Sequence, residues 1–251
     1  MTDNNPNIQY GGKSLFGASV GILMLDARFP RIPGDMGNAM TWPFPVHYKI
    51  VRGASPDRVV RQQAEGLLGP FIDAARELVA DGADGITTNC GFLSLFQDDI
   101  AAAVGVPVAT SSLMQVNMIQ SLLPPAKKVG ILTVSAETLT EAHLKAANVP
   151  LETPVFGTEN GRGFSRFILN NEESMDVGAA RADIIDAARE LAATCPDLGA
   201  VLLECTNMVP YAADIRRELG VPVFSIYTFI LWFQAALIPR AFESTILDSR
   251  R

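Results

Sequence analysis

Residues 84–124, DGITTNCGFLSLFQDDIAAAVGVPVATSSLMQVNMIQSLLP, align without a gap on residues 199–239, GAVLLECTNMVPYAADIRRELGVPVFSIYTFILWFQAALIP. Nine positions are identical at a constant offset of 115 residues. They include Cys90 with Cys205, and the helix-breaking run GVPV at 105–108 with the same four residues at 220–223. The chain therefore contains one structural unit twice.

Each copy has the pattern of a strand, a cysteine-bearing turn, a helix, a short strand opened by GVPV and a second helix that ends at proline. Apolar residues at helical spacing precede each copy, over 57–80 and 175–193, and an apolar strand stands farther upstream, at 17–25 and 128–134. Strands that alternate with helices are typical of parallel sheets with helices on both faces. The sequence predicts an α/β fold of two similar parallel-sheet lobes related by a pseudo-twofold axis.

The repeat also suggests how the chain is divided and where it binds. We expect a mobile N-terminal tail at 1–14, a first lobe at 15–125 and a second lobe at 126–251. In an alternative arrangement, the last helix crosses back onto the first lobe. Ligands of open parallel sheets bind beyond the carboxyl ends of the strands, where Cys90 and Cys205 both stand. The active site is therefore expected in the cleft between the lobes, with one thiol on each wall.

Composition narrows the class of protein. The 251 residues are 48% hydrophobic with a formal net charge of −7, which favours a well-filled core and argues against a nucleic-acid partner. The most apolar stretch, 221–237, is too interrupted by polar residues to span a membrane, and the N-terminus lacks a signal-peptide pattern. We therefore expect a cytoplasmic protein with reduced thiols and no membrane partner. The two histidines and three cysteines have no metal-ligand spacing, so no protein-bound metal is expected.

A pair of thiols suits one kind of chemistry. A free thiol has a pKa of about 8.5, which falls near a helix N-terminus or a cation, so it can act as a base near neutral pH. Two thiols on opposite sides of one carbon can remove a proton from one face and return a proton to the other, which inverts a stereocentre. A single cysteine at a strand end is as readily a small buried hydrophobe, and Cys195, which has no repeat partner, is interpreted that way.

The segments TTNCGF (87–92) and LLECTNM (202–208), with the apolar first strand, resemble the aspartate/glutamate/hydantoin racemase superfamily from about Val20 to Pro239. Cys205-Thr206-Asn207 is similar to the second catalytic motif of that superfamily. The first motif differs, because Gly91 and Phe92 follow Cys90 where glutamate racemases have Asn-Thr. The segment GILMLDARFPRIPGD (21–35) is nearer to a less characterised branch that includes relatives of algal dimethylsulfoniopropionate lyases.

The resemblance implies a cofactor-independent isomerase, a racemase or epimerase of a small amino acid or related carboxylic acid. Cys90 and Cys205 would be its catalytic acid and base. The partner it implies is a small anionic carboxylate, bound by groups near the strand ends, for which the candidates are Asp26, Asn89, Thr133, Ser135, Thr206 and Asn207. The resemblance implies no cofactor and no metal.

Two other functions stay open. A cofactor-free decarboxylase or lyase of a small carboxylate, similar to the dimethylsulfoniopropionate lyases, would use the same scaffold. A non-enzymatic, two-lobed small-molecule binding protein would share the tandem lobes, but binding alone gives no reason to duplicate a thiol. The aromatic cluster at 224–233 is interpreted as helix packing against the core or against a second copy in a homo-oligomer.

Two finer expectations concern the surroundings of the thiols. The proline-rich, irregular segment 26–45 follows a strand end and is predicted to cover the mouth of the cleft. Glu204, if its carboxylate approaches the neighbouring sulfur, would raise the pKa of Cys205 by like-charge repulsion. Cys90, with no acid beside it in sequence, would then be the resting thiolate. Strand alternation could instead direct Glu204 away from Cys205.

Overall fold

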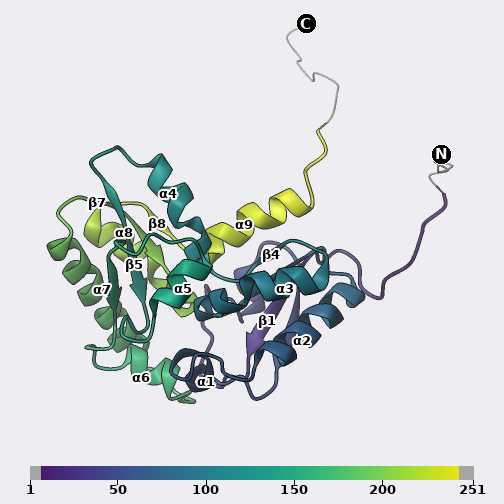
Figure 1. Ribbon diagram of the computed structural model, residues 1–251, viewed down its shortest axis with the longest axis horizontal. Helices are drawn as coiled ribbons and strands as arrows, with labels where there is room; N and C mark the ends of the chain where they lie inside the picture. Colours follow the sequence, from purple (N-terminus) through teal and green to yellow (C-terminus); the bar gives the residue numbers. More distant parts are fainter. Residues whose placement is uncertain (1–6, 243–251) are drawn as a thin grey trace, which may run out of the picture.

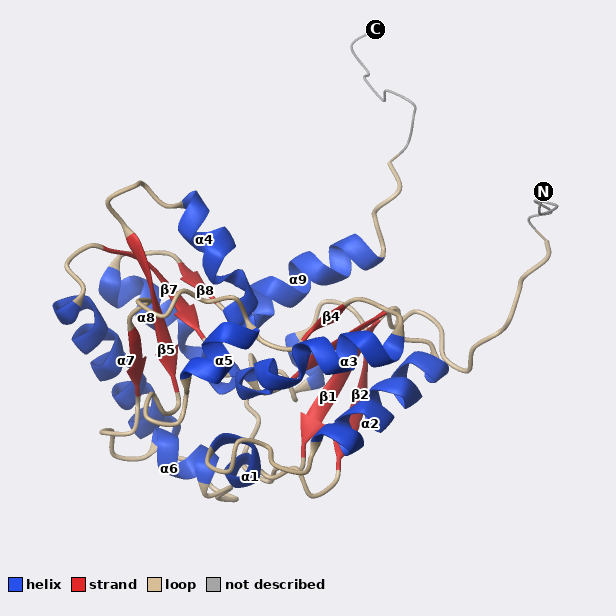
Figure 2. Ribbon diagram, in the orientation of Figure 1, coloured by secondary structure: helices blue, strands red, loops and turns tan. Residues whose placement is uncertain are grey.

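The computed structural model describes residues 7–242 and contains two four-stranded parallel sheets, as the repeat predicts (Figures 1 and 2). The first sheet has the order β2-β1-β3-β4 and the second β6-β5-β7-β8. The strands are β1 (Val20–Leu25), β2 (Val46–Val51), β3 (Gly85–Thr88), β4 (Val108–Ala109), β5 (Lys128–Thr133), β6 (Val155–Gly157), β7 (Leu198–Leu203) and β8 (Val223–Phe224). Because the two strand orders correspond, the sheets are two copies of one topology.

The repeat holds down to single elements. The short 3-10 helices η2 (Gly91–Phe96) and η4 (Thr206–Tyr211) follow the two cysteines, and α3 (Gln97–Val104) and α8 (Ala212–Leu219) come next. Both α-helices end at a glycine of the GVPV run, Gly105 at φ 69° and Gly220 at φ 72°. The left-handed conformation is the usual one for a glycine after a helix, so the matching breakers stop matching helices.

The backbone beside the cysteines is also duplicated. The amide of Asn89 donates to the carbonyl of Leu23 at 3.0 Å, and the amide of Glu204 donates to the carbonyl of Leu132 at 2.8 Å. Each bond joins the residue before a cysteine to the central strand of its own sheet. Cys90 and Cys205 therefore leave equivalent strand ends.

Helices cover both sheets. The first half has α1 (Pro56–Val60) and α2 (Leu68–Asp81); the second has α5 (Glu141–Ala146), α6 (Phe164–Leu169) and α7 (Val177–Thr194). The helix expected over 175–193 matches α7, whose N-cap Asp176 accepts from the amide of Ala179. The single helix expected over 57–80 is wrong, because it breaks between α1 and α2. Pro70 lacks an amide proton and fits only the first turn of a helix, so α2 begins anew just before it.

Two helices pack on the sheet of the opposite half. In the first half, η3 (Ser112–Gln115) leads into α4 (Val116–Leu122), and Gln120 of α4 bonds the backbone of Val129 in β5. In the second half, α9 (Ile226–Leu237) packs Ile230 and Phe233 with Val20 of β1. In Figure 1, α4 lies beside the second sheet, which it contacts through β5, and α9 runs toward the first half. The last helix thus crosses back onto the first sheet, and α4 crosses in the other direction.

Both expected terminal regions are described only in part. Residues 1–6 of the expected tail, and 243–251 of the expected second lobe, lie outside the described residues. Residues 7–14 form no helix or strand, and Lys13 bonds the carbonyl of Gly82 at 3.0 Å. Within 7–242, no helix has the length and apolar character needed to cross a membrane.

Candidate active site

One pocket lies between the two halves, at the carboxyl ends of the central strands β1 and β3 of the first sheet and β5 and β7 of the second. It has about 350 Å³ of empty space, open solvent at its mouth included. Both Cys90 and Cys205 line it, together with Leu25, Phe29, Pro56, Val60, Asn89, Gly91, Phe92, Val134, Ile168, Glu204, Thr206 and Asn207. These residues come from both halves of the chain. The structure thus brings together the two cysteines that the repeat paired.

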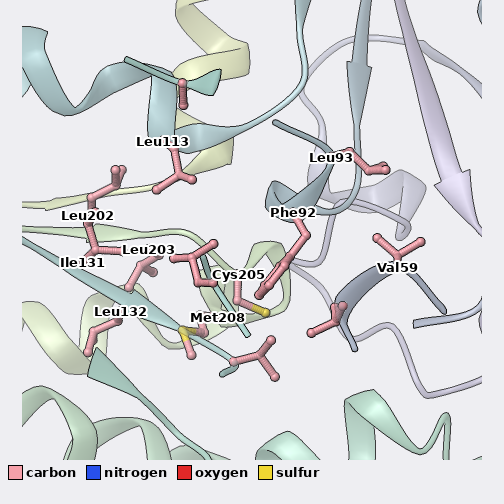
Figure 3. Close-up of a cluster of buried hydrophobic side chains, with 14 of the residues drawn as sticks. Val59, Phe92, Leu93, Leu113, Ile131, Leu132, Leu202, Leu203, Cys205 and Met208 are labelled. Carbon is pink, nitrogen blue, oxygen red and sulfur yellow. The ribbon is translucent and has the colours of Figure 1, made fainter. Parts of the chain in front are cut away.

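The two thiols share one local feature, a backbone amide two residues further along the chain. Cys90 is partly exposed and Cys205 is buried, and neither forms a disulfide. The backbone amide of Phe92 interacts with the sulfur of Cys90, and that of Asn207 with the sulfur of Cys205. Each amide lies two residues after its cysteine and favours the thiolate, so it lowers the thiol pKa. Figure 3 shows Cys205 between the apolar side chains of β5 and β7 and the ring of Phe92.

Burial raises the pKa of both thiols, and its effect is larger than that of the backbone amides. It is the largest cause of a raised pKa at both Cys90 and Cys205, because a thiolate loses its hydration in an apolar pocket. The Glu204 carboxylate is the second cause at both sulfurs. Glu204 therefore raises the pKa of Cys205, as expected, but it does the same to Cys90 across the lobes. Adjacency to Glu204 in sequence is no longer a reason to make Cys90 the resting thiolate.

More distant charges distinguish the two thiols. Arg31 lowers the pKa of Cys90, whereas Asp35 and Cys90 itself raise that of Cys205. Arg31 and Asp35 form a mostly buried ion pair at 2.8 Å. Both belong to the irregular segment 26–45, which also contributes Phe29 to the pocket. That segment reaches the pocket through Phe29, and its ion pair acts on the pKa values of the two thiols.

A hydrogen-bonded chain runs from this segment to Cys205. Asp35 Oδ2 accepts from Asn207 Nδ2, and Asn207 Oδ1 accepts from the Cys205 thiol at 3.7 Å. The carboxylate therefore fixes which end of the Asn207 amide faces the sulfur. Sequence reasoning named Asn207 but missed Asp35, which is 172 positions away in the chain.

Asn89 and Thr206 are both in the pocket wall, and each has a structural bond. Asn89 Oδ1 accepts from the amide of Leu25 at 2.8 Å, which holds the ends of β1 and β3 together. The Thr206 hydroxyl donates to the carbonyl of Asn89 at 2.6 Å and joins the two halves. Of these two side chains, only the amide NH₂ of Asn89 is left without a protein partner, so it is the polar group available to a ligand.

Three of the expected substrate-binding residues do not line the pocket. The Asp26 carboxylate binds Arg52 at 3.2 Å and the amide of Gly53 at 3.2 Å. Thr133 is buried and donates to Glu204 Oε2 at 2.6 Å, and Ser135 accepts from the amide of Thr138 in a turn. The sequence placed them near strand ends correctly, but side-chain direction takes them away from the cavity.

Glu204 is the pocket residue whose importance the sequence only hinted at. It is fully buried, Oε2 is bonded to Thr133, and Oε1 has no hydrogen-bond partner. Its signal in the sequence is an acidic residue at the position that Asn89 occupies in the first copy. Burial raises the pKa of Glu204 to about 7, and the Thr133 hydroxyl opposes the shift.

The remaining candidates are structural. Cys195 caps the end of α7 and is buried away from the pocket. Burial lowers the pKa of His143 to about 4, and its ring packs edge-on to Phe92 at 5.0 Å. Within residues 7–242, no three His, Cys, Asp or Glu side chains are arranged to hold a metal ion.

The family model for Asp/Glu/hydantoin racemase matches residues 72–233, which include both cysteines and most of the two sheets. The chain belongs to this family. The match confirms the resemblance stated from the cysteine motifs.

Relatives with assigned activities are distant in sequence. A dimethylsulfoniopropionate lyase of Durusdinium sp. clade D is 27% identical over 236 residues, which cover 88% of this chain and 73% of that protein. Dimethylsulfoniopropionate lyase 7 of Emiliania huxleyi is 29% identical over 239 residues, which cover 88% of this chain and 67% of that protein. A third such lyase, also from Emiliania huxleyi, is matched over only 45% of its length.

Solved structures share the fold. Arylmalonate decarboxylase has a TM-score of 0.52 at 19% identity, with 89% of this chain and 94% of that chain covered. Glutamate racemase isoform RacE1 from Bacillus anthracis has a TM-score of 0.57 at 14% identity, with 89% and 85% covered. At such identities the likeness establishes the α/β architecture alone.

Proposed function

We propose that the chain is a cofactor-independent enzyme that moves a proton at the carbon next to the carboxylate of a small organic acid. Cys90 and Cys205 are the catalytic pair. The observation that carries the proposal is that both thiols line one pocket, each with a backbone amide directed at its sulfur. A thiol that is otherwise only buried has no need of an amide donor.

Each thiol acts on one face of the substrate α-carbon. The thiolate of one cysteine takes the proton from the substrate carbon, so a C–H bond breaks and an S–H bond forms. The thiol of the other cysteine gives its proton to the opposite face. The product is the mirror-image acid, and the protein is a racemase or epimerase. After the step the cysteines have exchanged protonation states, so they can convert the opposite enantiomer, and a proton exchange with solvent restores them for the first one.

Neutral donors bind the substrate carboxylate. No Lys, Arg or His side chain is among the residues that line the pocket. The free NH₂ of Asn89 and the backbone amides at the starts of η2 and η4 supply hydrogen bonds instead. Asn207 holds its place by its bond to Asp35, and the Thr206 hydroxyl serves to join the halves.

A lyase is the second candidate, and a specific observation favours it. The curated relatives described above are named dimethylsulfoniopropionate lyases, and apolar side chains make up most of the pocket wall. The first step would be the same proton abstraction. A substrate with a leaving group on the next carbon would then form an alkene. For a substrate with a second carboxylate on the same carbon, loss of carbon dioxide would itself form the carbanion in place of proton abstraction, and one thiol would protonate that carbon. A reducing compartment such as the cytoplasm would keep the thiols free, and we include that location in the proposal.

The test is incubation in deuterium oxide with a panel of chiral amino acids, hydroxy acids, malonates and sulfonium carboxylates. Deuterium at the α-carbon with loss of optical activity identifies a racemase. An alkene or carbon dioxide identifies a lyase or decarboxylase. A protein that catalyses none of these, or that keeps its activity in both Cys90→Ser and Cys205→Ser, would refute the proposal.

A further inference from the structure

The Glu204 carboxyl group occupies a place where charge is costly. Its side chain is fully buried, and Oε1 has no hydrogen-bond partner. A Cβ atom on Gly91 would collide with that oxygen, so the carboxyl group of the second half packs directly on the residue after Cys90. Glu204 is itself the residue before Cys205. One carboxyl group therefore lies against both cysteine-bearing turns.

Only one polar contact supports the charged form of Glu204. The Thr133 hydroxyl donates to Oε2 at 2.6 Å. Loss of hydration outweighs this bond, and the pKa of Glu204 rises to about 7. Glu204 is the only carboxyl group among the residues that line the pocket. Near neutral pH it can hold or release its proton.

Other charged groups near the pocket are already paired. Arg31 and Asp35 bind one another at 2.8 Å, and Asp35 also accepts from Asn207. Their charges act on Cys90 and Cys205, whereas burial and Thr133 are what shift Glu204. The two thiols are thus the titratable groups that face Glu204.

We propose that Glu204 determines when the cysteine pair can carry a thiolate, because either thiol ionises readily only while Glu204 holds its proton. The inference rests on the proposed function in making the thiolate the reactive species. Glu204 is a positioning residue that acts through the cysteines. Once the carboxylate forms, a thiolate would be a second negative charge in a small apolar pocket, and repulsion disfavours it.

The proposal predicts a particular pH dependence. Below the pKa of Glu204, the thiolate population rises tenfold with each pH unit. Above it, the first proton lost by the pocket comes from Glu204, so the population with one thiolate and a protonated carboxyl stops rising. The rate of thiol modification should therefore bend near the pKa of about 7. Glutamine in place of Glu204 keeps the shape without the charge, and the bend should disappear.

The experiment measures alkylation of each cysteine by iodoacetamide against pH, with mass spectrometry as the readout. We expect Glu204→Gln and the wild type to react at similar rates at about pH 6. The variant should be faster by up to about a hundredfold at about pH 9, two units above the bend. Glu204→Asp should retain a bend, and Glu190→Gln, an exposed carboxyl on α7, should match the wild type.

Thr133→Val is the second variant and tests the same group without touching it. Loss of the hydroxyl donor should move the bend to higher pH, since that bond stabilises the carboxylate. A constant rate difference at every pH would assign Glu204 a purely structural role, and an unchanged bend in Glu204→Gln would assign the titration elsewhere. Either result overturns the proposal. Alkylation needs no substrate, so these outcomes are independent of whether the proposed racemase or lyase activity is found.

Discussion

The hydroxyl of Thr206 donates to the backbone carbonyl of Asn89 at 2.6 Å. Asn89 precedes one cysteine and Thr206 follows the other, so this single bond joins the two cysteine-bearing turns across the halves of the molecule. Both residues are buried. The relative position of the two thiols therefore depends on a bond that neither thiol makes.

Thr206→Val should remove that bond and leave a buried carbonyl unpaired. The expected loss of folding free energy is about 1–3 kcal/mol, measured by urea denaturation. Thr194→Val, the same change at an exposed position on α7, should alter stability by less than about 0.5 kcal/mol. Equal effects in the two variants would show that the bond to Asn89 contributes nothing.

Cys90→Ser and Cys205→Ser should each abolish the two-face reaction. A serine hydroxyl is a far weaker acid than a thiol, and a positioned acid or base contributes about a hundredfold or more to the rate. Each variant should still exchange deuterium from the face that its remaining thiol serves. Cys195→Ser should keep full turnover, because Cys195 lies at the end of α7. Full racemisation by either of the first two variants would contradict the two-thiol mechanism.

Gly91→Ala should destabilise the protein by about 1–3 kcal/mol, since overpacking a filled core carries a cost of that order. The added methyl group would meet the carboxyl and the backbone carbonyl of Glu204. The control is Gly69→Ala in α2, where a Cβ meets nothing within 4 Å. Thermal denaturation of the two variants compares them directly, and a Gly91 variant as stable as the control would show that Glu204 can yield.

Glu204→Gln should change how stability depends on pH. A buried carboxyl with a pKa raised from 4.5 to about 7 binds its proton more tightly in the folded state. Folding is therefore penalised as pH rises from about 4.5 to about 7, by about 3 kcal/mol in total. The glutamine variant has no carboxyl group to ionise at this position, so this pH-dependent loss of stability is absent. Relative to wild type, it should gain about that amount between about pH 4 and about pH 8 in urea denaturation, and parallel curves would contradict the expected shift.

The fold could be predicted from the sequence because the two copies of the repeat can be compared with each other. Nine identities at one offset aligned two strand ends, two glycine stops and two cysteines without any knowledge of the structure. The helix over 57–80 failed because residues 61–67, ahead of Pro70, leave the helical conformation, with Gln63, Ala64 and Gly66 at positive φ. Periodicity reports which face of a segment is buried, and it is insensitive to a break between two helices that share that face.

The site was less accessible, because side-chain direction and distant partners decide it. Asp26 stands at a strand end like Asn89, yet it turns to Arg52. Asp35 reaches Asn207 across the pocket from an irregular segment, for which the sequence offers no register. The acidic character of Glu204 was visible, but its effect on Cys90 required the second half of the chain to be in place.

Because α4 and α9 cross over, each half covers part of the sheet of the other half. Either half alone would leave one sheet bare on the face where the foreign helix packs, with its own last helix projecting into water. Two identical single-unit chains could satisfy both needs by exchanging these helices, and a fused duplicate would inherit the exchange. The present arrangement has the geometry of a domain-swapped dimer whose two subunits are joined in one polypeptide. Because the two copies are joined in one chain, they can differ at equivalent positions, as Asn89 and Glu204 do, and still pack against each other.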